Sequence, residues 1–458
     1  MLKGYDEYQE SQLPWVEKIP SQWQWLRNGY LLTEHKDKVG EEFSKYTLLS
    51  LTTTGVKEKD INDTSGKVPE SYEGYQKVNP GDMVFCLFDL DCSAVFSGLS
   101  NYKGMITSAY DVARPVDEYV SPRYLKYWFD SVFKGRYYKI FSKSVRYTIN
   151  YDSFKTLKSP VPPKEEQDQI VRYLDWKVSE MNHFIHEKKK QIKKLEELKI
   201  TKIDELITKG LNPSVEMKPS NVEWLGDIPV HWDVDHIKQH FTVKKRIAGK
   251  EGYDVLSITQ QGLKVKDIST NEGQMAMDYS GYQFVYPGDF AMNHMDLITG
   301  YVDLSDKFGV TSPDYRVFSL DDTEHCYAPF YLRVFQIGYK RRIFYKFGKG
   351  AANQGRWRLP KTAFYDYAIQ VPPIDEQIEI EKACLKLEQE IDSMIDGIRK
   401  EIELVEELRV KTIADVVTGQ VDVRNVVIPE YVVDDESDED LDYDDVEDES
   451  DNSDDAEE

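Results

Sequence analysis

An internal repeat constrains this chain more than any other sequence feature. Segments about 210 residues apart carry the same short phrases in the same order. Ile-Pro-x-x-Trp begins at residues 19 and 228, Pro-Gly-Asp at 80 and 287, and Pro-Pro-x-acid-Glu-Gln at 162 and 372. An arginine followed by an aromatic residue also recurs, as Arg146-Tyr147 and Arg356-Trp357. This pattern predicts two related bodies built by a pseudo-twofold internal repeat.

A long helix is predicted after each Pro-Pro pair, because proline fits the approach to a helix and not its interior. Apolar residues then recur at spacings of three, four and seven, which is typical of a coiled coil. The predicted seam includes Ile185, Ile192, Leu195 and Leu198 in the first copy, and Ile395, Ile402, Val405 and Leu408 in the second. Gly210 and Gly419 are the predicted helix stops. Each helix would run about 40 residues, or roughly 60 Å, and two such stripes favour an antiparallel coiled coil.

The segments between the helices are rich in aromatic, β-branched and turn residues, which predicts mixed α/β globules. The expected class is therefore α+β: two mixed α/β domains separated by two long helices. The expected boundaries are residues 1–160 for the first globule, 161–212 for the first helix, 213–370 for the second globule, 371–428 for the second helix and 429–458 for a tail.

The net charge of −24 gathers at one end of the chain. Residues 434–458 contain 17 acidic residues and no Lys or Arg, which leaves 65 acidic and 58 basic residues elsewhere. Such a segment buries too little apolar surface to fold, so a disordered acidic tail is expected. The rest of the chain is only mildly acidic, which is compatible with a local basic surface.

The four cysteines include no Cys-x-x-Cys pair, so we expect no zinc site, no disulfide framework and a reducing, cytoplasmic setting. No apolar run is long enough for a signal peptide or a membrane span, so no membrane association is expected. His236 and His240 have the spacing of two metal ligands on one helical face, but no third ligand lies near them in sequence. We therefore expect no metal and no other cofactor.

Catalytic motifs are absent from the sequence. It contains no Asn/Asp-Pro-Pro-Tyr segment of an amino-methyltransferase, no Gly-x-Gly-x-x-Gly after a strand and no phosphate-binding loop. These absences predict a chain without catalytic residues of its own.

Basic residues next to planar or amide side chains are the candidates for contact with a DNA duplex. In the first globule they are Lys143, Arg146 and Tyr147. In the second they are Lys245, Arg246, Arg341, Arg342, Lys349, Asn353, Gln354, Arg356 and Arg358. Arg146 and Arg356 occupy matching places, which favours a shared role; a structural role at the approach to the helix is the alternative.

The repeated phrases, taken together with the helical text KKKQIKKLEELKITKIDELITKGL and its echo RKEIELVEELRVKTIADVVTGQV, resemble the specificity subunits of type I restriction–modification systems. The resemblance covers about residues 10–428; the acidic tail departs from it. It implies that the globules are target recognition domains that read the two halves of a split, asymmetric site in double-stranded DNA. It also implies that the helices set the spacing, at one to two DNA turns.

The same resemblance implies partners. Two methyltransferase subunits would dock on the helices, for which the seam residues Ile185, Ile192, Leu195, Ile395, Ile402 and Val405 are candidates, and motor–endonuclease subunits would join for restriction. Two alternatives remain open at this point. The chain could be a scaffold that binds only proteins, or the recognition partner of a fused nuclease–methyltransferase.

Overall fold

The structure is a computed structural model that describes residues 2–61, 69, 71–142, 147–267, 276, 278–350 and 357–431. These residues form two compact units. Unit 1 contains residues 2–189 and 399–431, and unit 2 contains residues 190–398. Two long helices, α4 (Lys164–Lys209) and α8 (Ile374–Val417), contribute one part to each unit. The predicted mixed α/β class with two long helices is confirmed, whereas the acidic segment 434–458 lies outside the described residues.

Unit 1 combines short β-strands with helices. Its strands are β1 (Tyr8–Glu10), β2 (Lys18–Pro20), β3 (Gln24–Arg27), β4 (Leu32–Glu34), β5 (Thr47–Thr52), β6 (Gly55–Glu58), β7 (Gln76–Val78), β8 (Met83–Phe85), β9 (Ser97–Leu99), β10 (Gly104–Ile106), β11 (Asp111–Pro115) and β12 (Lys158–Val161). Its shorter helices are α1 (Asn28–Leu31), η1 (Gly40–Lys45), α2 (Pro122–Lys134), η2 (Tyr137–Phe141) and α3 (Tyr151–Thr156). Two four-stranded sheets have the orders β6-β5-β10-β7 and β4-β11-β8-β9, and β3 pairs with β12.

Unit 2 repeats much of this order. Its strands are β13 (Met217–Pro219), β14 (Asp227–Pro229), β15 (Asp233–His236), β16 (Phe241–Lys244), β17 (Leu256–Thr259), β18 (Gly262–Val265), β19 (Gln283–Val285), β20 (Asp289–Met292), β21 (Val302–Leu304), β22 (Gly309–Thr311), β23 (Arg316–Leu320) and β24 (Ala368–Val371). Its shorter helices are α5 (Ile237–His240), α6 (Ala328–Lys340), η3 (Phe344–Phe347) and α7 (Lys361–Tyr365). The sheet β16-β23-β20-β21 has the same order of elements as β4-β11-β8-β9 in unit 1.

The Pro-Gly-Asp turns show how local sequence sets these sheets. Gly81 and Gly288 have φ values of 88° and 89°, which glycine adopts at little cost. The following aspartates close each turn by accepting a backbone N–H, from Asn79 to Asp82 at 2.7 Å and from Tyr286 to Asp289 at 2.8 Å. The strands that follow, β8 and β20, are buried along their whole length. Each turn therefore directs an apolar strand into the centre of its sheet.

Each unit has a main core that combines one globule with the start of one long helix and the end of the other. The core of unit 1 includes Trp23, Ile170 from the start of α4 and Val416 from the end of α8. The core of unit 2 includes Trp232, Ile380 from the start of α8 and Ile207 from the end of α4. Burial of these large side chains, each worth about 1.5–3 kcal/mol, holds the globule to the helices.

Matching hydrogen bonds stabilise both junctions. The indole of Trp23 donates to Glu166 at 2.9 Å, and the indole of Trp232 donates to Glu376 at 3.0 Å. The side chain of Gln377, which is fully buried, donates to two backbone carbonyls and accepts the Tyr327 N–H at the start of α6. The side chain of Gln167 makes the same three bonds in unit 1. It donates to the carbonyls of Pro162 and Tyr119 and accepts the N–H of Ser121. The Glu-Gln of each repeated phrase thus fixes its globule to the helix that follows.

Unit 1 is also closed by the two ends of the described chain. The carbonyl of Lys3 accepts the N–H of Asp422 at 2.9 Å, and the side chain of Gln420 donates to the carbonyl of Lys18 at 2.8 Å. The hydroxyl of Tyr5 donates to Glu166 at 2.5 Å. Segments more than 400 residues apart in sequence therefore form one core.

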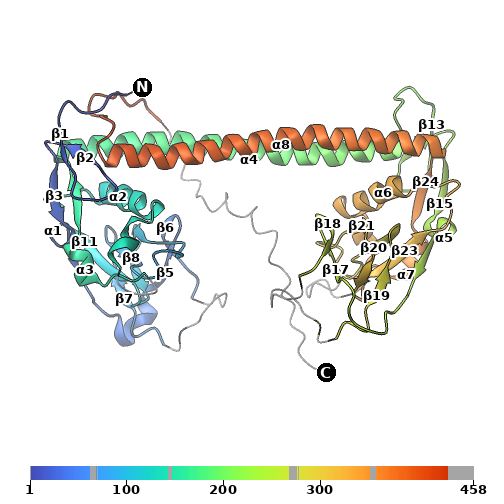
Figure 1. The fold of residues 1–458 in the computed structure, drawn as a ribbon, viewed down its shortest axis with the longest axis horizontal. Helices are drawn as coiled ribbons and strands as arrows, with labels where there is room; N and C mark the ends of the chain where they lie inside the picture. Colours follow the sequence, from blue (N-terminus) through green and yellow to red (C-terminus); the bar gives the residue numbers. More distant parts are fainter. Residues whose placement is uncertain are drawn as a thin grey trace. The chain divides into compact units, whose positions relative to one another are not determined.

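The long helices run antiparallel within each unit (Figure 1). In unit 1, Lys188 pairs with Glu401 at 2.5 Å, and Arg409 donates to Asn182 at 2.6 Å. In unit 2, Lys199 pairs with Asp392 at 2.6 Å. The helices begin directly after the Pro-Pro pairs, and Gly210 and Gly419, with φ of 75° and 70°, follow their last turns, as predicted. In the described part of the chain, none of the helices is both long and apolar enough to cross a membrane.

Candidate nucleic-acid interface

The segment around Lys349 and Arg358 presents two cations from a fixed backbone. The N–H of each residue donates to the carbonyl of the other, at 2.8 and 3.1 Å, so the two residues form an isolated antiparallel β-bridge. The indole of Trp357 donates to the carbonyl of Tyr345 at 2.7 Å and anchors the residue next to this bridge. Both cationic side chains are exposed and form no ion pair with another described residue. The predicted contacts Asn353, Gln354 and Arg356 lie outside the described residues.

A buried positive group, the guanidinium of Arg316, lies next to the Lys349–Arg358 bridge. Arg316 donates to the carbonyl of Leu359 at 2.8 Å, and its guanidinium lies 4.6 Å from the centre of the Phe364 ring. Burial lowers the pKa of Arg316 to about 10, so it remains charged near neutral pH. Burial and the charges of Arg316 and Arg358 lower the pKa of His294 to about 3. The positive charge here therefore comes from arginine and lysine side chains. Arg316 and His294 were not predicted, because no sequence motif indicates their roles.

Two of the predicted DNA contacts, Arg246 and Arg341, are paired with carboxylates. Arg246 pairs with Asp289 and lies over the Tyr286 ring at 4.8 Å, so it stabilises the Pro-Gly-Asp turn. Unit 1 has a similar pair, because Arg114 donates to Asp82 at 2.7 Å. These bonds leave the Arg246 guanidinium only partly available to a ligand.

The other basic positions of unit 2 differ in their freedom. Arg341 pairs with Asp204 at 2.6 Å and ties the end of α6 to α4. Lys245 and Arg342 are exposed and have no ion-pair partner among the described residues. Arg342 has a φ of 54°, which turns the chain sharply after α6. Of the predicted contacts in unit 2 that the structure describes, Lys245, Arg342, Lys349 and Arg358 are thus the most available.

In unit 1 the structure describes only one of the three predicted contacts. Tyr147 is exposed, has a φ of 44°, and its carbonyl accepts the N–H of Leu90 at 3.3 Å. Lys143 and Arg146 lie outside the described residues. A hollow of about 320 Å³ close to this segment is lined by Glu34, Asp111 and Asp152 against a single lysine, Lys36. Its acidic lining makes it an unfavourable phosphate site.

The predicted docking residues lie largely inside the helix pair. Ile185, Ile395 and Ile402 are 1%, 3% and 8% exposed, so their side chains pack between the helices and offer no surface to a partner. Ile192, Leu195 and Val405 are half-buried. Leu198 and Leu408, predicted to lie in the seam, are instead exposed. The large exposed apolar side chains of the helices are Phe184, Leu404, Leu408 and Val410 in unit 1, and Leu198, Leu385 and Met394 in unit 2.

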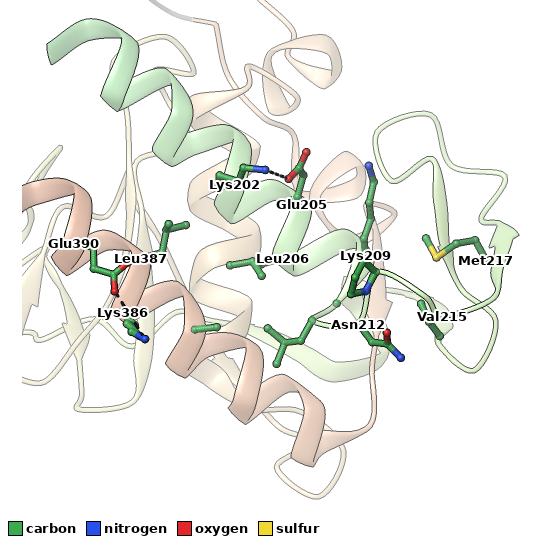
Figure 2. A pocket seen from close by; sticks show the side chains of 14 residues that line it. Lys202, Glu205, Leu206, Lys209, Asn212, Val215, Met217, Lys386, Leu387 and Glu390 are labelled. Atoms are coloured by element: carbon green, nitrogen blue, oxygen red, sulfur yellow. Dashed lines mark hydrogen bonds and ion pairs between the residues drawn. The ribbon is translucent and has the colours of Figure 1, made fainter. Parts of the chain in front are cut away.

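A larger hollow of about 690 Å³ lies in unit 2, where α4 ends beside α8 (Figure 2). Its apolar lining comes from Leu206, Leu211, Val215, Met217, Ala383 and Leu387. Charged residues stand at its rim, including the pair Lys202–Glu205 at 2.8 Å. The hollow is thus open to solvent at a charged rim and apolar within.

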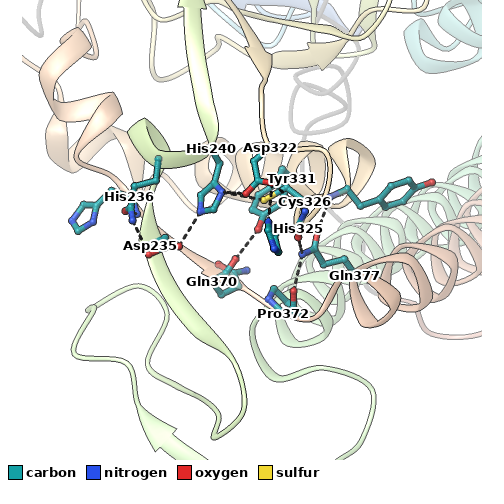
Figure 3. A network of polar contacts seen from close by, with 12 residues as sticks. Asp235, His236, His240, Asp322, His325, Cys326, Tyr331, Gln370, Pro372 and Gln377 are labelled. Atoms are coloured by element: carbon teal, nitrogen blue, oxygen red, sulfur yellow. Dashed lines mark hydrogen bonds and ion pairs between the residues drawn. The ribbon is translucent and has the colours of Figure 1, made fainter.

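A polar network surrounds His240 (Figure 3). The Nε2 atom of His240 lies 2.9 Å from Asp235, and its Nδ1 atom lies 2.9 Å from Asp322 and 3.4 Å from the sulfur of Cys326. Burial raises the pKa of the Cys326 thiol to about 11. His236, the predicted companion of His240, is not part of this group. Sequence spacing could not reveal the group, because Asp322 and Cys326 lie more than 80 residues beyond His240.

Comparison with known proteins relates most of the chain to one class. The putative type I restriction enzyme MjaX specificity subunit of Methanocaldococcus jannaschii is 24% identical over 448 residues, covering 89% of this chain and 96% of that protein. The type I restriction enzyme MjaVIII specificity subunit of the same organism is 23% identical over 435 residues, covering 89% and 95%. A solved structure described as the basis of complex assembly and conformational transition of the type I R-M system matches with a TM-score of 0.59 and 14% identity. It covers 88% of this chain and all of that one, which shows a shared fold. No family model matches the chain.

Proposed function

Because the chain belongs to the specificity-subunit family of type I restriction–modification systems, we propose that it selects the DNA sequence on which such a complex acts. Each globule reads one half of a bipartite, asymmetric target in double-stranded DNA. The observation that carries the proposal is similarity along nearly the full length of both proteins to curated specificity subunits. The two alternatives, a protein-only scaffold and the partner of a fused nuclease–methyltransferase, are not favoured by these relatives.

The division of labour follows the repeat. Residues 1–160 and 213–370 are the target recognition domains, and residues 161–212 and 371–428 are spacer helices that form an antiparallel coiled coil. The matched junctions at Trp23–Glu166 and Trp232–Glu376 support equivalent attachment of the two domains. Their surfaces differ in sequence, which supports two different half-sites.

The DNA contacts in unit 2 centre on Lys349 and Arg358, with Lys245 and Arg342 as further phosphate ligands. Exposed cations without a carboxylate partner can release counterions from DNA, whereas Arg246 and Arg341 act chiefly by positioning their segments. In unit 1, Lys143, Arg146 and Tyr147 take the corresponding part.

Catalysis lies in the partners, which are two methyltransferase subunits and the motor–endonuclease subunits. Exposed apolar side chains on the helices support docking there, notably Phe184 and Leu404 in unit 1 and Leu385 and Met394 in unit 2. The apolar hollow at Leu206 and Leu387 is a further docking point.

Domain exchange tests the proposal. Replacing residues 213–370 by the matching domain of a relative, within the complete complex, should change one half of the methylated target and leave the other half and the spacing unchanged. Mapping of modified bases in cellular DNA reads the outcome. An unchanged target in a complex that still methylates DNA would refute the assignment.

A second test concerns the contacts. Duplex binding by the complex carrying both Lys349→Ala and Arg358→Ala should weaken. The negative slope of the logarithm of the association constant against the logarithm of the salt concentration should become shallower by about 2, because each phosphate contact contributes about 1. Lys382→Ala, an exposed lysine on α8, is the control and should leave the slope unchanged. An unchanged slope in the double variant would remove these residues from the interface.

A further inference from the structure

The group around His240 has an unusual charge arrangement. Asp235 accepts a hydrogen bond from Nε2, which leaves Nδ1 as the lone-pair nitrogen of a neutral imidazole. That nitrogen faces an oxygen of Asp322 at 2.9 Å and the sulfur of Cys326 at 3.4 Å. A carboxylate is also an acceptor. The arrangement is therefore favourable only if a cation, either a second proton or a metal ion, lies at Nδ1.

We propose that His240, Asp322 and Cys326 form a site for a divalent transition metal of the zinc class. They offer one nitrogen, one oxygen and one sulfur, and their ligand atoms all lie within 4.8 Å of one another. Tetrahedral zinc, with bonds of about 2.0–2.3 Å, holds its ligand atoms roughly 3.3–3.8 Å apart, so small side-chain shifts suffice. Three protein ligands leave a fourth position for water. On binding, the thiol proton passes to solvent and a metal–sulfur bond replaces it.

The surrounding contacts are those that a metal ligand needs. Asp235 holds the imidazole through its other nitrogen, as carboxylates do beside many metal-bound histidines. Gln239 in turn donates to Asp235 at 3.0 Å. The second oxygen of Asp322 accepts from the backbone N–H of His325 at 3.1 Å and lies 3.0 Å from the His325 ring. The ligands are thus oriented, while His240 and Cys326 are buried.

Unit 1 shows that the fold does not require these residues. In unit 2 the N–H of Asp321 donates to the carbonyl of His240 at 2.9 Å, the N–H of Asp322 lies 3.5 Å from the same carbonyl, and the carbonyl of Asp322 accepts the N–H of Cys326 at 3.2 Å. In unit 1 Val116 makes both kinds of contact alone, because its N–H donates to the carbonyl of Leu31 and its carbonyl accepts the N–H of Val120. Leu31 and Val120 thus occupy the places of His240 and Cys326, and Val116 takes the place that Asp321 and Asp322 share. Unit 1 forms the same backbone contacts with apolar side chains, so these contacts do not require a histidine, a carboxylate or a thiol.

A metal ion bound at this site would join three segments of unit 2. His240 ends α5, Asp322 lies in the connection after β23, and Cys326 directly precedes Tyr327, whose N–H is held by Gln377. Bound metal would therefore stabilise the attachment of the domain to α8. This role is independent of DNA recognition.

Cobalt binding tests the proposal on the full-length chain after removal of metal by a chelator. Co²⁺ should bind at one equivalent and give the near-ultraviolet absorption of a cobalt–thiolate bond, and Zn²⁺ should displace it. Zn²⁺ at about 100 times its dissociation constant should raise the unfolding transition by roughly 5–10 °C. Failure to take up Co²⁺, or uptake without thiolate absorption, would overturn the proposal.

Matched variants separate the site from other effects. Cys326→Val introduces the residue type found in unit 1, so the variant should fold, lose the thiolate absorption and bind Co²⁺ roughly 100-fold more weakly or worse. His240→Leu, chosen on the same basis, is the second variant. Cys384→Ala removes another buried cysteine, on α8, and should keep full absorption. The proposal fails if Cys326→Val keeps the absorption or if Cys384→Ala removes it.

Discussion

Gln377 offers the sharpest test of how the globule of unit 2 is attached to the helix that follows it. Its side chain is fully buried and makes three hydrogen bonds, to the carbonyls of Pro372 at 2.7 Å and His325 at 2.8 Å and from the N–H of Tyr327 at 2.8 Å. Leucine has a similar volume but can make none of them. Gln377→Leu therefore leaves three backbone groups without partners in an apolar junction.

The expected cost follows from this count. A buried group that loses its hydrogen-bond partner costs about 1–3 kcal/mol, and Tyr327 at the start of α6 can regain some solvent. We expect a total loss of about 3 kcal/mol. For a unit of this size that corresponds to a drop of about 6–12 °C in the unfolding temperature.

Thermal unfolding by calorimetry measures this loss, and hydrogen exchange locates it at the start of α6. Gln336→Leu is the matched control, because Gln336 makes one weak bond, to Val302 at 3.4 Å, and should lose less than about 1 kcal/mol. Gln167→Leu should reproduce the large loss in unit 1, where the same three bonds occur. If Gln377→Leu were no less stable than Gln336→Leu, the reasoning about the junction would be refuted.

Two further predictions concern backbone conformation and pH. Gly419→Ala should destabilise unit 1 by more than about 1 kcal/mol, because φ is 70° and a Cβ would lie 2.2 Å from Pro20. The control Gly397→Ala, in open space within α8, should stabilise the protein by about 0.5–1 kcal/mol. Equal effects of the two substitutions in denaturant titrations would contradict this contrast. The lowered pKa of His294 keeps its imidazole neutral in the folded state, whereas in the unfolded chain the same imidazole gains a proton below about pH 6.5. The free energy of unfolding is therefore highest above that pH and falls by about 1 kcal/mol at pH 5.5. His294→Gln should flatten this dependence in unfolding measured from pH 7.5 to 5, and an identical pH profile in the variant would argue against it.

The fold was predictable where local sequence decides it. The Pro-Pro pairs, the acidic first turns and Gly210 and Gly419 set the ends of the long helices, and the Pro-Gly-Asp turns precede buried strands as expected. The apolar spacing predicted the seam between the helices less well. A straight α-helix has 3.6 residues per turn, so its contact face drifts away from a strict seven-residue repeat. Leu198 and Leu408 accordingly face outward.

The candidate site was less predictable, since its contacts depend on residues far apart in sequence. The sequence around Arg246 does not predict its pairing with Asp289, and the sequence around His240 does not predict its contact with Cys326. Basic clusters in a sequence identify cations but not which of them carboxylates already occupy. The structure makes that distinction, separating Lys349 and Arg358 from Arg341.

The closure of unit 1 by both ends of the chain imposes an order on biosynthesis. Residues 190–398 leave the ribosome as one continuous stretch and can complete their core at once. The first globule completes its core later, because its partners Val416 and Asp422 are translated after residue 398. Nascent residues 1–161 therefore keep an apolar face, including Ile19 and Trp23, uncovered through most of translation. That interval is when chaperone binding would matter most for this protein, and a chain interrupted after residue 398 would retain one finished domain and one that is permanently open.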